Sequence, residues 1–144
     1  MPATTPNNLL ALDVGGVRIG VAIAHAIARL PRPLTTLDAT APDVLAQLER
    51  IIHVEEIGRI VVGLPRNLQG QDTEQTAVVQ AFAAGLESLG LPISFQDEAL
   101  TSRKAEAELN ARGKAYNKGD IDSLAATYIL EDWLAVNPTP EVTA

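Results

Sequence analysis

Three acidic residues from distant parts of the sequence are candidates for metal-dependent chemistry, and Asp122 is the most informative. It lies in segment 121–134, whose hydrophobic residues recur at helical spacing and form a broad apolar face. At about 100° per residue, Asp122 projects in line with Ala126 and Ile129, toward the core. Because an isolated ionised carboxylate is costly to bury, Asp122 should have a partner: a metal ion, a cation or several donors.

Asp13 and Glu98 each end a short run that is typical of a β-strand. Asp13 follows the apolar residues 9–12, and Glu98 closes the run 93–98 directly after Asp97. Side chains alternate along a strand, so Asp97 and Glu98 point to opposite faces and either could reach a shared site. Carboxylate oxygens suit Mg²⁺ or Mn²⁺, and two such ions can stabilise the attacking water and the departing oxygen of a phosphodiester. We predict that Asp13, Glu98 and Asp122 converge as metal ligands and catalytic residues, with Asp97 in reserve.

Each of these acids also has a structural explanation. Asp13 could close a hairpin turn through its own backbone. Asp122 could complement the dipole of its helix from the first turn, although that would not explain its core-facing direction. Asp97 could serve as a cap or a salt-bridge partner. Metal ligation is the interpretation that we favour for Asp13 and Asp122, with Glu98 preferred over Asp97.

Three other polar residues are auxiliary candidates. His25, after the second expected strand, could be a fourth ligand, a general base or a surface histidine, and we favour the last. Arg18, inside the expected hairpin, could brace Asp13 or contact a phosphate. Asn67 lies in a polar loop after a buried strand, where shaping a cleft is the favoured role.

The charge pattern bears on the partner. The net charge of −7 over 144 residues argues against sequence-blind attraction to polyanions. Basic residues nevertheless gather within sixteen positions, either as a solvated helix face or as a phosphate-contacting patch: Arg103, Lys104, Arg112, Lys114 and Lys118. If the site is a nuclease site, the residues expected to guide the nucleic-acid backbone are Arg18, Arg103, Lys104, Lys114 and Lys118.

Composition narrows the class of protein. The chain has no cysteine, so disulfides, thiolate metal sites and cysteine nucleophiles are excluded. No apolar run reaches the roughly 18 residues of a membrane span, and the N-terminus lacks a signal pattern. We expect a cytoplasmic protein with no membrane partner, either a monomer or a homodimer.

The order of expected elements is β-β-β-α-β-α-β-α-α, which predicts an α/β fold. Its mixed five-stranded sheet, with three antiparallel strands followed by two parallel ones, is flanked by helices. Ligands in such sheets usually collect beyond the carboxyl ends of the strands. We expect a single domain over 9–136, with residues 1–8 and 137–144 disordered.

Four sequence blocks, in order, resemble the YqgF family, also called RuvX, of bacterial RuvC-like nucleases. They are Leu-Asp-Val-Gly at 12–15 with Arg-Ile-Gly-Val-Ala at 18–22, Ile-Val-Val-Gly-Leu-Pro at 60–65 with Gly70, Asp-Glu at 97–98 with Leu-Thr-Ser at 100–102, and Asp122 with Leu-Ala-Ala at 124–126 and Ile-Leu at 129–130. The resemblance implies a ribonuclease H-like fold and a cytoplasmic, metal-dependent nuclease that matures the 5′ end of precursor 16S ribosomal RNA. It matches Asp13, Glu98 and Asp122 to the family's acids.

Two departures from the family pattern keep other functions open. Ala99 stands where the family usually has arginine, and Ala24-His25 stands where it usually has a serine-aspartate pair. The alternatives are a resolvase of Holliday junctions or other branched DNA, and an RNA-binding ribosome-assembly module without turnover. Asp13-Val14-Gly15-Gly16 also resembles a phosphate loop of the actin and sugar-kinase fold, but the chain has room for only one core domain.

Overall fold

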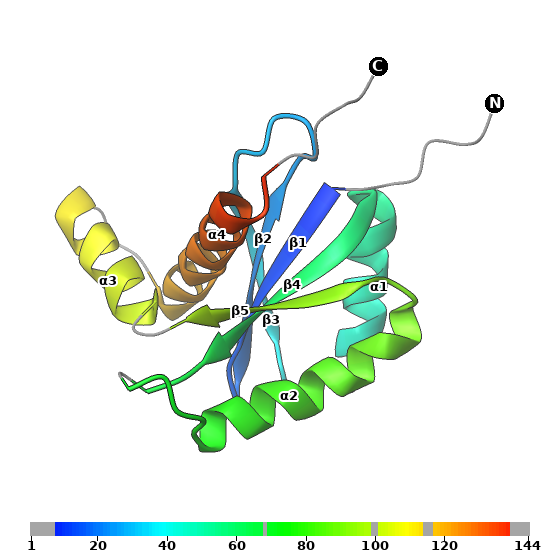
Figure 1. Ribbon diagram of the computed structural model, residues 1–144, viewed down its shortest axis with the longest axis horizontal. Helices are drawn as coiled ribbons and strands as arrows, with labels where there is room; N and C mark the ends of the chain where they lie inside the picture. The colour runs from blue at the N-terminus through cyan, green and yellow to red at the C-terminus, as the bar shows by residue number, and fades with distance from the viewer. Residues whose placement is uncertain (1–7, 68, 99–100, 114–116, 139–144) are drawn as a thin grey trace.

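The computed structural model describes residues 8–67, 69–98, 101–113 and 117–138, with backbone alone for 101–106. Those residues form five strands and four α-helices (Figure 1). In chain order they are β1 (Asn8–Val14), β2 (Arg18–Ala24), β3 (Arg32–Asp38), α1 (Val44–Val54), β4 (Ile57–Pro65), α2 (Glu74–Leu86), β5 (Ile93–Glu98), α3 (Thr101–Arg112) and α4 (Lys118–Val136). A short 3₁₀ turn, η1 (Glu87–Leu89), extends α2.

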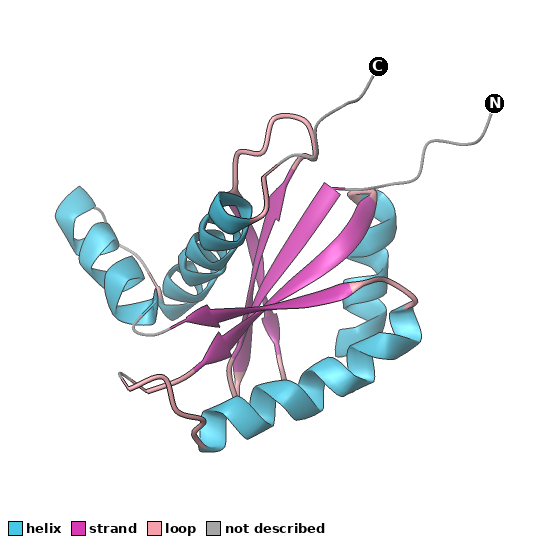
Figure 2. Ribbon diagram, viewed as in Figure 1, coloured by secondary structure: helices cyan, strands magenta, loops and turns pink. Residues whose placement is uncertain are grey.

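The five strands form one sheet with the order β3-β2-β1-β4-β5. Figure 2 shows this sheet with helices packed around it. β2 pairs antiparallel with both β1 and β3, whereas β4 pairs parallel with both β1 and β5. The predicted mixed sheet is therefore confirmed. Because β1, β4 and β5 run in the same direction, their carboxyl ends meet at one edge, where Asp13 and Glu98 are found.

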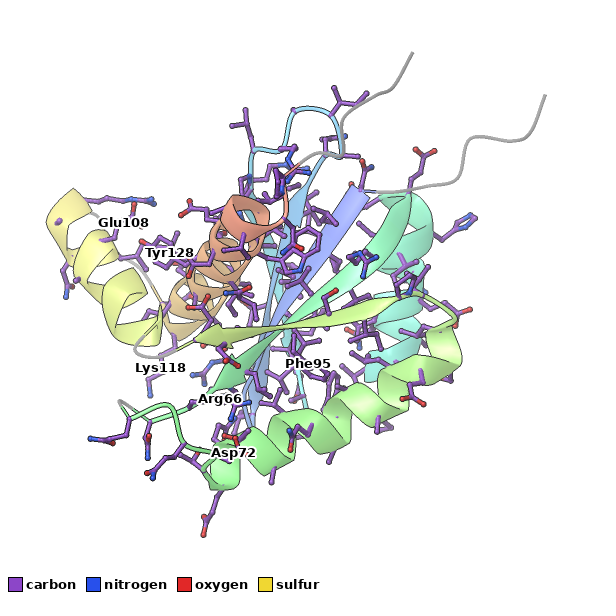
Figure 3. The ribbon with its side chains drawn as sticks, viewed as in Figure 1. Arg66, Asp72, Phe95, Glu108, Lys118 and Tyr128 are labelled. Atoms are coloured by element: carbon purple, nitrogen blue, oxygen red, sulfur yellow. The ribbon has the colours of Figure 1, made fainter. Side chains whose placement is uncertain are left out.

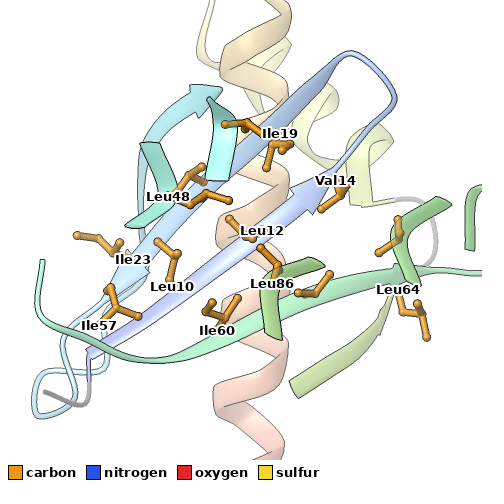
Figure 4. Close-up of a cluster of buried hydrophobic side chains, with 14 residues drawn as sticks. Leu10, Leu12, Val14, Ile19, Ile23, Leu48, Ile57, Ile60, Leu64 and Leu86 are labelled. Atoms are coloured by element: carbon orange, nitrogen blue, oxygen red, sulfur yellow. The ribbon is translucent and has the colours of Figure 1, made fainter. Parts of the chain in front are cut away.

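Both faces of the central strands are covered. Alternate residues of β1 point to opposite sides, and Leu10, Leu12 and Val14 join the larger core, beneath α1 and α2 (Figure 4). Leu9 and Ala11 point the other way and pack under α4. This two-sided burial explains why β1 lacks the apolar-polar alternation of a half-exposed strand.

Helix α4 lies directly on the sheet, whereas α3 stands to its side and packs against α4 (Figure 1). The N-terminus of α4 is fixed by a capping box, in which Asn117 accepts from the backbone of Asp120 and Asp120 accepts in return. The helix therefore begins at Lys118, three residues before the segment 121–134 that the sequence indicated. α3 joins the fold through Leu109, which packs with Leu124 and Tyr128.

The folded region begins and ends slightly beyond the expected bounds of 9 and 136. Asn8 belongs to β1, and its side-chain amide donates to the carbonyl of Glu55. Asn137 caps α4 and donates to the carbonyl of Trp133. Both asparagines were expected to be disordered, and their side-chain hydrogen bonds account for the difference. The remaining terminal segments, 1–7 and 139–144, lie outside the described residues.

Candidate metal centre

Asp13 sits at the carboxyl end of β1, on the face of the sheet that α4 covers. Its register partner in β2 is Gly20, and paired residues of neighbouring strands share a face. Ala11, two residues earlier, packs beneath α4, so the alternation of β1 sends Asp13 in the same direction. Asp13 is partly buried.

Asp122 reaches the same place from the N-terminal part of α4. Its Oδ2 accepts a hydrogen bond of 2.5 Å from Nε of Arg18, and the pair forms a salt bridge. The Asp122 side chain is only 17% exposed, which confirms the core-facing direction read from helical periodicity. The predicted partner of a buried carboxylate is thus present, and it is an arginine of β2.

Asp122 lies close enough to Asp13 to influence the ionisation of Asp13. Burial, and then the nearby charge of Asp122, raise the pKa of Asp13 from 3.8 to about 7. Two carboxylates that repel each other in a poorly hydrated place form a donor set that suits a hard divalent cation. Asp13 and Asp122 are therefore the residues of this centre whose chemistry suits a divalent cation.

Glu98 lies on the same face but is not part of a compact group. Its register partner is Pro65 of β4, and Gly63, two residues before, faces Ile129 of α4. The Oε1 atom of Glu98 is shielded from solvent. Among residues 8–67, 69–98, 101–113 and 117–138, however, no three or more Asp, Glu, His or Cys side chains are arranged to hold a metal ion. The structure brings two of the three predicted carboxylates together.

Asp97, the reserve candidate, faces the opposite side of the sheet. Its register partner, Leu64, belongs to the core under α1 and α2. Asp97 accepts a hydrogen bond of 2.9 Å from Nε of Arg66, which also forms a salt bridge with Asp72 just before α2 (Figure 3). The salt-bridge role left open for Asp97 is the one that the structure gives it.

His25 is placed away from the two aspartates, and Asn67 makes its side-chain hydrogen bonds within its own loop. Asp13 pairs with Gly20, and His25 follows Gly20 by five residues along β2 and just beyond its end, so about 16 Å of chain separates His25 from the position opposite Asp13. His25 is exposed, in agreement with the favoured surface role. The side chain of Asn67 closes its own loop by accepting from the backbone of Gln69 and Gln71.

The basic candidates divide by position. Arg18 forms a salt bridge with Asp122, whereas the two roles left open for it were a brace for Asp13 and a contact to phosphate. Lys118 is exposed at the N-terminus of α4 (Figure 3), and Arg112, exposed on α3, pairs with Glu108. The side chains of Arg103 and Lys104, together with Lys114 and Ala99, lie outside the described residues.

Gly20 also belongs to this centre, although it was not among the residues expected there. It lies in the buried strand β2, opposite Asp13, and its Cα meets the backbone of Asp122 and Ser123. A glycine within an otherwise β-branched and aliphatic strand indicates a close backbone approach, and that signal was available in the sequence.

Comparisons with known proteins agree with this architecture. A family model described as "RuvX: Holliday junction resolvase" matches residues 7–136. A Chloroflexus aurantiacus protein described as "Putative pre-16S rRNA nuclease" is 46% identical over 130 residues, which cover 88% of this chain and 85% of that protein. A protein of Crocosphaera subtropica with the same description is 43% identical, with 87% of this chain and 90% of the relative covered.

A solved structure shares the fold at much lower sequence identity. RuvC of T. thermophilus, solved in complex with a Holliday junction substrate, superposes with a TM-score of 0.55 at 17% identity. The match covers 92% of this chain and 97% of the RuvC chain. This similarity confirms the predicted ribonuclease H-like fold class. No helix in the described part of the chain is long and apolar enough to cross a membrane.

Proposed function

Since the chain belongs to the RuvX family, we propose that it is a nuclease that hydrolyses phosphodiester bonds with a divalent metal ion. The observation that carries the metal-dependent chemistry is the pairing of Asp13 and Asp122. The two side chains come from β1 and α4, more than one hundred positions apart in sequence, and the charge of Asp122 acts on the ionisation of Asp13. Without a cation, the repulsion between the two carboxylates is energetically unfavourable. Binding of an ion would offset this repulsion.

Asp13 and Asp122 would hold the ion, with Glu98 as the third carboxylate. A bound Mg²⁺ or Mn²⁺ would supply a Lewis acid that polarises the phosphodiester and activates water. Glu98 is supported by its place on the same face of the sheet, at the carboxyl end of β5. Arg18 fixes Asp122 through Oδ2 and offsets part of the negative charge that a phosphate would otherwise meet.

The substrate that we favour is structured RNA, at the 5′ end of precursor 16S ribosomal RNA. Support comes from the relatives described as pre-16S rRNA nucleases. Lys118 is exposed at the start of α4, four residues from Asp122, where it can contact the nucleic-acid backbone; Arg103, Lys104 and Lys114 are proposed to extend this contact. This role would place the protein in the cytoplasm.

A second candidate substrate is branched DNA. The matching family model carries the description of a Holliday junction resolvase, and the superposed RuvC was solved with such a junction. The fold similarity to RuvC does not separate the two substrates, because a shared fold supports many activities. The non-catalytic RNA-binding module remains the third alternative, and it predicts binding without product.

A cleavage assay tests the proposal. The full chain is incubated with Mg²⁺ or Mn²⁺ and either a 16S precursor RNA carrying its 5′ leader or a four-way DNA junction. We expect metal-dependent cleavage of the RNA, abolished in Asp13→Asn and Asp122→Asn. Asp97→Asn is the matched control. It removes the carboxylate next to Glu98 at the end of β5, which faces the opposite side of the sheet, and this variant should cleave normally. Equal cleavage by wild type and Asp13→Asn would refute the proposed metal centre.

A further inference from the structure

Asp122 is seated on the sheet through a contact between backbones. In β2, a Cβ added at Gly20 would come far closer to the carbonyl oxygen of Asp122 than 3.0 Å, a distance that real Cβ atoms essentially never cross. The same Cβ would lie 2.8 Å from the backbone nitrogen of Ser123. Neither obstacle is the movable end of a side chain, so any side chain at this position must displace the helix.

This contact lies where it can set the distance between the two aspartates. Gly20 is the register partner of Asp13, and it touches the backbone of Asp122 from the same face of the sheet. Two residues earlier in β2, Arg18 holds the Asp122 side chain. Two residues of β2 therefore position Asp122: Gly20 contacts its backbone, and Arg18 binds its carboxylate.

A second glycine steadies the same turn of α4. Gly119 offers its carbonyl to the hydroxyl of Thr36 in β3, at 2.7 Å. A Cβ at Gly119 would lie 3.1 Å from Oδ1 of Asn117 and 3.3 Å from the Thr36 hydroxyl, so the fit is tight but less severe than at Gly20.

We propose that Gly20 is a positioning residue of the metal centre, whose missing side chain sets the spacing of Asp13 and Asp122 and thereby the affinity for the divalent ion. The inference rests on the proposed function, since it assigns an ion to this pair. Gly63 of β4, which packs against the same helix, provides the contrast that separates this role from general packing. A Cβ at Gly63 would meet the side-chain end of Ile129, far along α4 from Asp122.

The test compares Gly20→Ala with Gly63→Ala in the full chain. Isothermal titration with Mn²⁺ gives the dissociation constant, and thermal unfolding without the ion gives stability. Both variants should lose stability. Gly20→Ala should weaken Mn²⁺ binding about tenfold or more, because displacements near 1 Å are costly to a positioned site. Gly63→Ala should stay within about twofold of wild type. Equal affinities of the two folded variants would overturn the inference.

Two further measurements cover the other outcomes. If Gly20→Ala does not fold, the milder Gly119→Ala decides, with an expected intermediate loss of Mn²⁺ affinity; an unchanged affinity would overturn the inference. If wild type binds no ion, the proposed metal chemistry fails. Gly20 is then judged from a double-mutant cycle of Asp13→Asn and Asp122→Asn at pH 8, measured in the wild-type and glycine-variant backgrounds. The coupling between the aspartates should fall by about half or more, and an unchanged coupling would refute the role of Gly20.

Discussion

The two faces of the sheet are built from different kinds of residue. Beneath α1 and α2, the strands contribute large aliphatic side chains, among them Leu10, Leu12 and Ile60 (Figure 4). Beneath α4, the same strands present small residues such as Ala11 and Ala22, with glycines where the helix comes closest. The carboxylates Asp13 and Asp122 lie on this second face.

This difference between the two faces assigns stability mainly to one face and the candidate chemistry to the other. Large interdigitating side chains bury more apolar area per residue, so the face under α1 and α2 should supply most of the hydrophobic stabilisation. Small residues bury less but let the backbone of α4 approach the sheet, which brings a helix carboxylate to a strand carboxylate. Three further measurements can break or sharpen this contrast.

The largest expected effect is on stability and comes from Leu12→Ala. Leu12 is fully buried on the α1 and α2 face, so its truncation should lower the free energy of unfolding by about 2–5 kcal/mol, measured with denaturant. The neighbouring change Asp13→Asn, on the other face, should not destabilise the metal-free protein at pH 8. A loss of similar size from both changes would contradict the division between the faces.

The next effect concerns pH and comes from Asp13. Its pKa is raised from 3.8 to about 7, so between these values the folded state binds more protons than the unfolded state. The free energy of unfolding should therefore fall as pH rises from about 4 to about 8, and this contribution is lost as pH passes the folded pKa. Its ceiling is about 4 kcal/mol, from about 1.36 kcal/mol for each pKa unit.

Denaturant unfolding at pH 5 and pH 8, without metal, measures this contribution. Asp13→Asn should flatten the pH dependence and be the more stable protein at pH 8. Added Mg²⁺ should stabilise wild type more at pH 8 than at pH 5, because the ion binds the ionised carboxylate. The opposite pH slope in wild type, or the same slope in Asp13→Asn, would show that Asp13 does not carry the effect.

The elements of this centre were predictable from sequence to different degrees. The apolar run before Asp13 and the helical periodicity around Asp122 correctly predicted a strand end for Asp13 and a core-facing position for Asp122. In both segments, the spacing of the apolar residues shows which side of the element is buried. Alternation alone could not choose between Asp97 and Glu98, because only the register with Pro65 shows which of them faces α4. The exposed position of His25 agrees with the surface role that was favoured from the sequence, which placed His25 at the end of a strand.

Contacts made by loops and by the close approach of backbones were harder to predict. Arg66 leaves β4 in a polar loop, where no periodicity indicates its partners Asp72 and Asp97. Bracing of Asp13 was one of two roles left open for Arg18, but the sequence could not show that Arg18 reaches Asp122 across 104 positions. Such pairings depend on the packing of α4, which local pattern does not determine.

The smallest expected effect is the loss of stability when an ion pair is removed, and it should differ between the two faces of the sheet. Arg66→Gln removes a pair whose Asp97 side chain is 69% exposed, so it should change the free energy of unfolding by less than about 1 kcal/mol. Arg18→Gln leaves the 17% exposed Asp122 without its guanidinium and should cost more at pH 8. Asp122→Asn should suppress the cost of Arg18→Gln, because the charge that Arg18 offsets is then gone. If Arg66→Gln lowered the free energy of unfolding more than Arg18→Gln, the more stabilising ion pair would lie on the α2 face and not beside the candidate metal centre.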